Sequence, residues 1–537
     1  MMSGLTATFD EKERTWSGPK GENTLMDDDI SLGSIIFKAM PNWPKNISQI
    51  CDEDGISLTF EQTLRWSIRI AQFLKRKGLN HKDVIGIIAA DSAYLAPLGI
   101  GCFFNGTPFQ AMNPSLDEAT TNKLLSQTKP AIIFCDENVY EKIKSASREW
   151  QPDIYTITGK VLGVPSIKVL LEPTGTEEMY QPEPLAEGCR QTVALLCSSG
   201  TTGFPKLIAI SKVNFLIHDD RGVGIVMYTP SSLDWNTGIL ALVSSITSGT
   251  TQIRSRKPYT PENFVKLVRK YKINVTYLAP RHLASLISCP EVTSEAMESI
   301  RVLSYAGGSV SLATLERAKN IFTKALITST YALTECGILA QNFTNSNFSS
   351  AGRPFYNVKF RVVDEIGHNL AHNQVGEIYA HTGRPWNGYY GSQEATRSFQ
   401  DSEGWFHTGD MGYFDSENFL YIVDRKKEVL KYQGLQYWTT EIEEVISELP
   451  QVRDVCVVGI YDEKVGDEAG ALVVISHGSN ITAKEIVNHV AKRLPAIQKQ
   501  LHAGVQFTEQ LPANANGKTL RKAAREEFIA KNLLTKG

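Results

Sequence analysis

The sequence predicts an α/β protein, and three observations support this class. Of the 537 residues, 42% are hydrophobic and 21% are charged, a composition that excludes wholesale disorder and rod-like folds. Strand-like and helix-like segments alternate through the first 330 residues, which is typical of parallel sheets covered by helices. At roughly 150 residues per domain, the length indicates about three or four structural units.

The first clear helix is expected at residues 59–78. Thr59 and Gln62 have the spacing of a capping box, and Gly78 can close the other end. Apolar residues recur on one face of this segment, as an amphipathic helix requires. They are Leu64, Ile68, Ala71 and Leu74.

Residues 84–104 form the longest apolar stretch and could be mistaken for a membrane span. Asp91 interrupts the stretch and Pro97 follows it. We therefore expect a strand at 84–89, a turn and a buried helix.

Buried strands are expected at four further apolar runs. Each run is followed by a turn or loop, which is where α/β folds place ligand-binding groups. The runs are residues 131–135, 193–197, 275–278 and 301–305.

The pattern changes after about residue 350. Segments 358–363 and 375–380 alternate between apolar and polar residues, which predicts a small antiparallel or barrel-like unit up to residue 424. A compact tail follows, with strands near 452–459 and 470–476. A helix should begin at Thr482, where Glu485 completes another capping box.

Charge, cysteines and termini exclude several classes of protein. With 55 basic and 58 acidic residues the net charge is −3, so we expect no nucleic acid partner. Eight cysteines without a Cys-x-x-Cys pair predict neither a disulfide scaffold nor structural zinc. The first thirty residues are polar, and the chain does not end in Ser-Lys-Leu. We expect a protein without a membrane span that is cytoplasmic, or peroxisomal without a recognisable C-terminal signal.

The strongest local signal is the segment Ser-Ser-Gly-Thr-Thr-Gly-Phe-Pro-Lys, which directly follows the apolar run 193–197. Glycines let backbone N–H groups turn toward an anion, hydroxyls add donors, and Lys206 supplies a positive charge for phosphate. The Walker pattern is excluded because Lys206 lies between Pro205 and Leu207. The alternative is a surface turn without a ligand. The predicted phosphate-binding residues are Ser198, Ser199, Gly200, Thr201, Thr202 and Gly203.

This segment resembles the phosphate loop of the adenylate-forming superfamily, which includes acyl-CoA synthetases, firefly luciferase and peptide-synthetase adenylation domains. Other motifs follow in the family's order, and the resemblance spans roughly residues 50–525. These motifs are Asn113-Pro114, Ala306-Gly307-Gly308, Tyr331-Ala332-Leu333-Thr334-Glu335, Thr408-Gly409-Asp410, Asp424-Arg425, Lys431-Tyr432-Gln433-Gly434 and Asn516-Gly517-Lys518.

The resemblance implies a division of the chain. A large N-terminal domain, residues 1–424, would contain two helix-covered sheets and the barrel-like unit at about 350–424. Residues 425–537 would form a small, mobile α+β domain that swings about a hinge at Lys427.

The resemblance also implies a site for MgATP. Glu335 would help to hold Mg²⁺, and Thr334 would line the nucleotide site. Tyr331 would stack on adenine, Asp410 would accept hydrogen bonds from the ribose hydroxyls, and Arg425 would contact ribose or phosphate. Without the family's order of motifs, each of these residues would be an ordinary loop, turn or core residue.

Three lysines carry the implied catalysis. Lys206 belongs to the phosphate loop, and Lys518 would stabilise the transition state in which a carboxylate attacks the α-phosphate. Lys431 and the turn at Gly434 would face the site after domain rotation, when the thiol of coenzyme A attacks. Lys522 next to Lys518 is expected to be an ordinary surface lysine.

The acyl pocket is expected at Trp235, Gly307 and Gly308. Trp235, after Asp234, stands where many relatives carry a histidine, so it should reshape the pocket rather than transfer a proton; the alternative is a core tryptophan. Other departures from the family's pattern are Leu207 and Ala332, where glycine is usual, and Lys212, near a common histidine.

The predicted function is that of an acid–thiol ligase similar to insect luciferase-like acyl-CoA synthetases. A carboxylic acid, expected to be a medium- or long-chain fatty acid, would react with MgATP to give acyl-AMP and pyrophosphate, and coenzyme A would then take the acyl group. The alternatives are a luciferase-type monooxygenase and a catalytically silent binding protein. A peptide-synthetase unit is disfavoured because no carrier protein domain is expected after Lys518.

Overall fold

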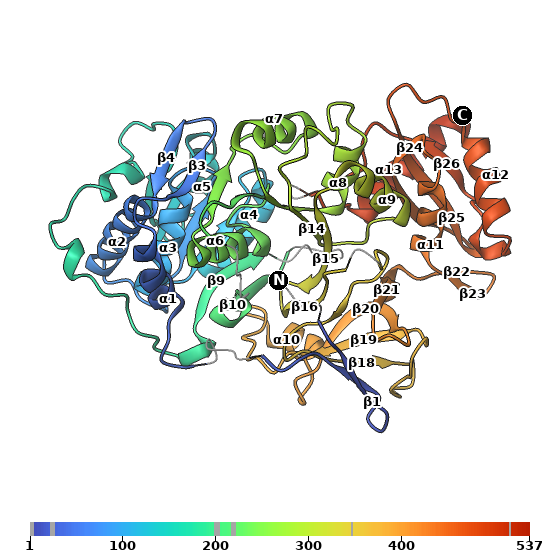
Figure 1. The fold of residues 1–537 in the computed structure, drawn as a ribbon, viewed down its shortest axis with the longest axis horizontal. Coiled ribbons are helices and arrows are strands. Elements are labelled where there is room, and N and C mark those ends of the chain that lie inside the picture. The colour runs from blue at the N-terminus through green and yellow to red at the C-terminus, as the bar shows by residue number, and fades with distance from the viewer. Residues whose placement is uncertain are drawn as a thin grey trace.

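The computed structural model describes residues 5–21, 27–197, 205–215, 222–344, 347–514 and 517–536. Across these ranges the strands form four sheets (Figure 1). Two early segments join later sheets: the strands Ile47–Cys51 and Ile56–Thr59 belong to the second sheet, and an N-terminal hairpin belongs to the third. Within the same ranges, no helix combines the length and the apolar character needed to cross a bilayer.

The first sheet has the strand order β10-β9-β6-β5-β7-β8. Its inner strands are parallel and β10 is antiparallel at one edge. The side chains of α2 and α3 pack on one face, and those of α4 and α5 pack on the other. The elements are α2 (Phe60–Arg76), β5 (Ile85–Ile88), α3 (Leu95–Asn105), β6 (Phe109–Met112), α4 (Glu118–Thr128), β7 (Ile132–Cys135), α5 (Tyr140–Ala146), β8 (Asp153–Thr156), β9 (Thr192–Cys197) and β10 (Leu207–Ser211).

The second sheet has nine strands in the order β17-β16-β15-β14-β13-β11-β12-β3-β4. Helices α7, α8 and α9 cover one face, whereas α1 and α6 pack toward the first sheet. The elements are α1 (Leu32–Ala39), β3 (Ile47–Cys51), β4 (Ile56–Thr59), β11 (Val226–Tyr228), α6 (Asn236–Ser248), β12 (Thr251–Arg254), α7 (Pro261–Tyr271), β13 (Val275–Leu278), α8 (Pro280–Ile287), β14 (Val302–Ala306), α9 (Leu312–Ile321), β15 (Leu326–Leu333), β16 (Gly337–Asn342) and β17 (Arg353–Pro354).

The third sheet is the predicted small antiparallel unit, with the order β1-β2-β18-β19-β20-β21. Its first two strands come from an N-terminal hairpin that the sequence did not reveal. Trp16 of this hairpin is fully buried and stacks on Phe414 at 4.4 Å between ring centroids. The elements are β1 (Thr8–Asp10), β2 (Thr15–Ser17), β18 (Lys359–Val363), β19 (Gly376–His381), α10 (Gln393–Phe399), β20 (Phe406–Phe414) and β21 (Leu420–Arg425).

The fourth sheet lies at the C-terminal end and has its own hydrophobic core. Three helices accompany it, which gives the expected α+β character (Figure 1). The elements are β22 (Leu430–Tyr432), β23 (Leu435–Tyr437), α11 (Thr439–Ser447), β24 (Val452–Asp462), β25 (Gly466–Ile475), α12 (Ala483–Arg493), β26 (Gly504–Phe507) and α13 (Arg521–Lys536).

Local sequence signals located several elements correctly. Both capping boxes are present: Thr59 and Gln62 exchange hydrogen bonds at the start of α2, as do Thr482 and Glu485 at the start of α12. The apolar stretch 84–104 divides into β5 and the fully buried helix α3, as expected. The α/β fold class is confirmed.

Candidate active site

The predicted phosphate loop lies largely outside the described residues, but its two ends are defined. Leu207, the first residue of β10, pairs with Cys197, the last residue of β9. The loop therefore connects two neighbouring strands at the edge of the first sheet. Lys206 is exposed, and its Nζ lies 4.8 Å from the ring centroid of Tyr389. The predicted residues outside the described ranges are Ser198, Ser199, Gly200, Thr201, Thr202 and Gly203.

Asp410 is the centre of a charged cluster that joins the second and third sheets. The residue is 3% exposed, and its carboxylate accepts a hydrogen bond from the Tyr331 hydroxyl at 2.6 Å and pairs with Arg425 Nε at 2.7 Å. Asp410 and Arg425 face each other on β20 and β21, whereas Tyr331 comes from β15. Burial raises the pKa of Asp410, and the nearby charge of Arg425 opposes that rise. Three predicted nucleotide residues thus form one hydrogen-bonded group.

Thr334 and Glu335 lie in the tight turn between β15 and β16, directly after an irregularity at Tyr331 and Ala332. Such bulges change the direction of the side chains that follow them. The half-buried carboxylate of Glu335 accepts a hydrogen bond from the Tyr389 hydroxyl at 2.7 Å.

Lys518 reaches the same cluster from the C-terminal part of the chain. Its loop is held by Asn514, whose side chain accepts the Lys518 N–H at 2.9 Å and whose own N–H donates to the Lys518 carbonyl at 2.9 Å. Burial lowers the pKa of the Lys518 ammonium, the positive charge of Arg425 lowers it further, and Asp410 acts in the opposite direction. The structure therefore brings the predicted catalytic lysine to the predicted ribose-binding carboxylate.

Close packing supports the loop that carries Lys518. Gly517 has φ of +79°, and a Cβ added there would lie 2.6 Å from Nε2 of His282 on α8. Glycine is therefore required both by its backbone conformation and by the histidine ring. The ring of His282 stacks on Tyr259, and burial lowers the pKa of His282 to about 4.

The connection between the third and fourth sheets contains the predicted hinge. Lys427 lies in a single helical turn between β21 and β22, and burial followed by the charge of Arg425 lowers its pKa. On the fourth-sheet side, Glu428 pairs with Arg521 at 2.5 Å. Arg521 also pairs with Glu443 at 2.6 Å, so two ion pairs stabilise this side of the connection.

Hydrogen bonds also cross this connection. Asp424, which is buried at the end of β21, accepts the N–H of Thr439 at 3.0 Å and its hydroxyl at 2.8 Å. The Thr440 hydroxyl donates to the Val423 carbonyl at 2.5 Å. We call these three bonds the hinge latch, because they tie the start of α11 to β21.

A further contact joins helix α11 to helix α9, which packs on the second sheet. The Glu444 carboxylate on α11 accepts the backbone N–H of Leu312 on α9 at 3.1 Å, and burial raises the pKa of Glu444.

Lys431 occupies a different place from Lys518. It lies in the β22–β23 hairpin, its side chain is exposed, and its backbone N–H donates to Asp467 at 3.1 Å. Gln433 and Gly434 form the turn, both with positive φ (+49° and +81°). The sequence analysis assigns Lys431 and Lys518 to different arrangements of the two domains, and in this structure Lys518 is the one of the two that reaches the Asp410 cluster.

The predicted acyl-pocket residues lie near the carboxyl ends of sheet strands. Trp235 is half-buried and directly precedes α6, and the neighbouring Asp234 accepts a hydrogen bond from Asn113 at 3.2 Å. Gly307 and Gly308 follow β14 and are exposed; a Cβ on Gly307 would meet no atom within 4 Å. Gly307 therefore borders open space at the edge where α/β folds bind ligands, whereas a Cβ on Gly308 would contact Pro280 at 3.4 Å.

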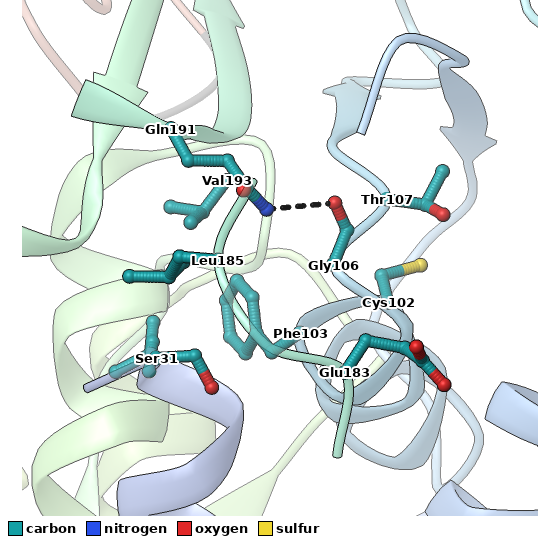
Figure 2. A pocket seen from close by; sticks show the side chains of 10 residues that line it. Ser31, Cys102, Phe103, Gly106, Thr107, Glu183, Leu185, Gln191 and Val193 are labelled. Atoms are coloured by element: carbon teal, nitrogen blue, oxygen red, sulfur yellow. Dashed lines mark hydrogen bonds between the residues drawn. The ribbon is translucent and has the colours of Figure 1, made fainter. Parts of the chain in front are cut away.

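A cavity between α1 and α3 is not a substrate site. Figure 2 shows it beside Phe103 and Leu185, next to the hydrogen bond from Gln191 to the Gly106 carbonyl (3.1 Å). Its volume of about 10 Å³ is the space of a single water. A larger open hollow of about 730 Å³ is lined by Trp386, Tyr389 and Tyr390 among others.

Sequence reasoning missed Tyr389 as a member of the candidate site and missed the hydrogen bonds of Asp424. Tyr389 is separated from Glu335 by 54 positions, and nothing in its local Gly-Tyr-Tyr-Gly sequence indicates that contact. Asp424 was recognised in a motif with Arg425 at the expected hinge, but its bonds to α11 depend on the tertiary structure.

The sequence matches a known family over most of its length. The profile of the AMP-binding enzyme family matches residues 37–390, and that of the AMP-binding enzyme C-terminal domain matches residues 441–518. Because the first match covers more than half of the chain, the protein belongs to the AMP-binding enzyme family. The predicted adenylate-forming superfamily is confirmed.

Characterised relatives share about a quarter of the residues. The 4-coumarate–CoA ligase 3 of Oryza sativa subsp. japonica is 26% identical and covers 94% of this chain and 93% of its own length. The luciferin 4-monooxygenase of Photinus pyralis is 26% identical and covers 94% of this chain and 95% of its own length. The fatty acid–[acyl-carrier-protein] ligase ScoC of Streptomyces coeruleorubidus is also 26% identical (90% and 94%).

Solved structures share the fold. The anthranilate CoA ligase AuaEII with anthranoyl-AMP has a TM-score of 0.84 at 19% identity, covering 94% of this chain and 98% of that one. ATP-bound MatB from Rhodopseudomonas palustris has a TM-score of 0.81 at 20% identity, covering 93% of this chain and 99% of that one. The luciferase-like enzyme of the nonluminescent mealworm Zophobas morio has a TM-score of 0.69 at 24% identity, covering 76% of this chain and 97% of that one. The expectation of ATP, Mg²⁺ and coenzyme A as reactants is confirmed at the level of this family.

Proposed function

We propose that the protein is an AMP-forming acid–CoA ligase and that its acid is a medium- or long-chain fatty acid. The observation that carries the proposal is the approach of Lys518, from the C-terminal part of the chain, to the Asp410–Arg425 pair. A mobile cation beside a buried carboxylate that can hold ribose suits the transfer of AMP to an acid, since two anions must meet in that reaction.

In the first half-reaction, the residues of the candidate site that take part have distinct roles. Asp410 binds the ribose hydroxyls, held in place by Tyr331 and Arg425. Thr334 lines the nucleotide site and Tyr331 packs against adenine. Lys518 donates hydrogen bonds to the carboxylate and α-phosphate oxygens as they approach, and Lys206 neutralises the leaving pyrophosphate.

The described residues fit a magnesium ion that arrives with ATP. Within the described ranges, His, Cys, Asp and Glu side chains form no cluster of three or more that could hold a metal by themselves. Glu335 offers a single carboxylate, and Mg²⁺ is commonly bound by one or two carboxylates with substrate phosphates and waters. When bound, the ion spreads the charge of the phosphates. Glu335 would supply the protein's share of its ligands.

In the second half-reaction, we propose that the part of the chain from Arg425 onward rotates about Lys427. Residues 1–424 and 425–537 are then the two moving bodies. The rotation withdraws Lys518 and presents Lys431 and the Gly434 turn to the acyl-adenylate, where the thiol of coenzyme A attacks. The hinge latch must open for this movement, because its bonds join the two bodies.

The preference for an aliphatic acid rests on the candidate pocket and on one relative. Trp235, Gly307 and Gly308 offer no charge to a second carboxylate, and a fatty acid ligase is among the relatives. Aromatic acids are the competing class, given the 4-coumarate and anthranilate ligases.

A panel of acids tests the proposal. The purified protein, MgATP and each fatty, cinnamic or dicarboxylic acid are scored for pyrophosphate release, with and without coenzyme A. Fatty acids should give the fastest release, and coenzyme A should convert the product to a thioester. Pyrophosphate release with aromatic acids alone would contradict the proposal of a fatty acid substrate. Light with luciferin and oxygen would indicate the monooxygenase, and failure to bind ATP would indicate a silent protein.

A further inference from the structure

We propose that Tyr389 is a positioning residue that holds the magnesium carboxylate Glu335 and the phosphate-loop cation Lys206 in place while leaving both charged. The proposal deepens the proposed adenylation step and rests on it. It concerns a residue that belongs to none of the sequence motifs described above.

Two contacts meet on one tyrosine. The Tyr389 hydroxyl donates to Oε1 of Glu335 at 2.7 Å. The ammonium of Lys206 lies 4.8 Å from the centroid of the same ring, within the range of a cation–π interaction. Tyr389 therefore contacts an acid at its hydroxyl and a base on its ring.

The backbone around Tyr389 is fixed to the strand that follows the phosphate loop. The Ala209 N–H donates to the Gly388 carbonyl at 3.1 Å, and the Tyr390 N–H donates to the Leu207 carbonyl at 2.8 Å. The Tyr389 N–H donates to Oγ1 of Thr396 at 2.9 Å. Because β10 begins one residue after Lys206, these bonds keep the ring in register with that lysine.

Ring packing and one glycine complete this support. The ring of Tyr389 contacts Trp386 and Phe399 at 5.3 and 5.9 Å between centroids. Gly388 has φ of +84°, and a Cβ there would lie 2.4 Å from Oγ1 of Thr396. A larger residue at 388 would displace the hydroxyl that holds the Tyr389 backbone.

The chemistry of a tyrosine suits this position. A tyrosine hydroxyl is protonated at neutral pH, so it can donate to the Glu335 carboxylate as a neutral group. A neutral donor orients a carboxylate without cancelling its charge, and it leaves the second carboxylate oxygen for a cation. An aromatic face likewise attracts an ammonium without neutralising it. A lysine or glutamate at this place would pair with one of the two groups and remove a charge that MgATP needs.

Two variants separate the contacts. Tyr389→Phe keeps the ring and removes the hydroxyl, whereas Tyr389→Leu removes both. Tyr390→Phe is the matched control, because Tyr390 is the next residue, is 40% exposed and carries the same hydroxyl. Thermal unfolding of each variant checks that it is folded, and the conservative Phe variant carries the test if the Leu variant is not.

The readout is ATP binding by calorimetry, with and without Mg²⁺, so it does not require turnover. For Tyr389→Phe we expect metal-free ATP binding within about twofold of the parent, and a loss of about tenfold in the gain that Mg²⁺ gives, the usual scale for a hydrogen bond to a charged group. Tyr389→Leu should also weaken metal-free binding several-fold. Tyr390→Phe should change neither.

The two proposals fail in different ways. If Tyr389→Phe keeps the full Mg²⁺ effect on ATP binding, Tyr389 does not position Glu335 and this inference is wrong. If the unsubstituted protein binds MgATP but adenylates no acid, the proposed function fails, while the binding comparison still decides the role of Tyr389.

Discussion

The Lys518 loop and the Lys431 hairpin belong to the same C-terminal part of the chain, yet they lie in opposite environments. Lys518 is half-buried and interacts electrostatically with Asp410 and Arg425, in a loop packed against His282. Lys431 is exposed at a hairpin of the fourth sheet. In this structure the C-terminal part of the chain places Lys518, and not Lys431, at the Asp410 cluster, as the proposed adenylation half-reaction requires.

Under the proposed mechanism, the observed arrangement belongs to the adenylation step. Burial of Lys518 against the carboxylate cluster, together with the closed hinge latch, is the geometry expected for adenylation. A second arrangement, in which Lys431 takes this place, requires the latch and the contact between Glu444 and Leu312 to break.

The largest effect should come from Lys518→Ala. Loss of a preorganised charge at the transition state typically costs about 10²–10³-fold in rate, so acid-dependent pyrophosphate exchange should fall by that factor. Thioester formation from preformed acyl-AMP should be nearly unchanged. Lys522→Ala, at an exposed neighbour, is the control. Exchange at the parental rate would remove Lys518 from the mechanism.

Lys431→Ala should give the reverse pattern. Thioester formation from acyl-AMP should fall by about tenfold or more, because a charge-assisted contact in the rotated form is lost. Pyrophosphate exchange should stay within about twofold, since the side chain is exposed in the observed form. Lys464→Ala, at another exposed lysine of this part, is the control. Equal losses in both steps would contradict the division of labour.

A smaller effect is expected from the hinge latch. Thr440→Val removes the bond to the Val423 carbonyl, worth about 0.5–1.5 kcal/mol. The ratio of thioester formation to adenylation should therefore rise by roughly two- to tenfold. Thr440→Ser keeps the hydroxyl and should behave like the parent. If Thr440→Val unfolds more readily than the parent but the ratio of the two rates does not change, the latch is purely structural.

The pH dependence should reveal the environment of Lys518. Because burial lowers its pKa, the ammonium loses its proton at a lower pH than an ordinary lysine does, and the adenylation rate should fall on that alkaline side. Lys518→Arg remains charged, so its slower rate should persist to higher pH. A rate profile with the same alkaline limb in both proteins would assign the limb to another group.

Local sequence signals predicted much of the fold. The capping boxes at Thr59 and Thr482 and the strand at 275–278 depend on residues close in sequence, so their prediction needs no tertiary information. The N-terminal hairpin was missed because β1 and β2 are three-residue strands whose partner, β18, lies far along the chain.

The candidate site was predicted mainly through motifs and was incomplete for a physical reason. Asp410 and Arg425 were both singled out, but only strand register places them opposite each other. Tyr389 acts through contacts with Glu335 and Lys206 that no local pattern encodes. Whether a lysine is enclosed, as at 518, or exposed, as at 431, likewise depends on how the fourth sheet is placed.

The central claim is that adenylation uses the observed arrangement and thioester formation uses another. The most direct test introduces Leu312→Cys and Glu444→Cys, whose parent residues are in contact between α9 and α11, and joins them with a short thiol crosslinker. Parent protein treated with the same reagent controls for the native cysteines. The account predicts that the joined protein keeps acid-dependent pyrophosphate exchange and loses thioester formation; undiminished thioester formation in the joined protein would contradict it.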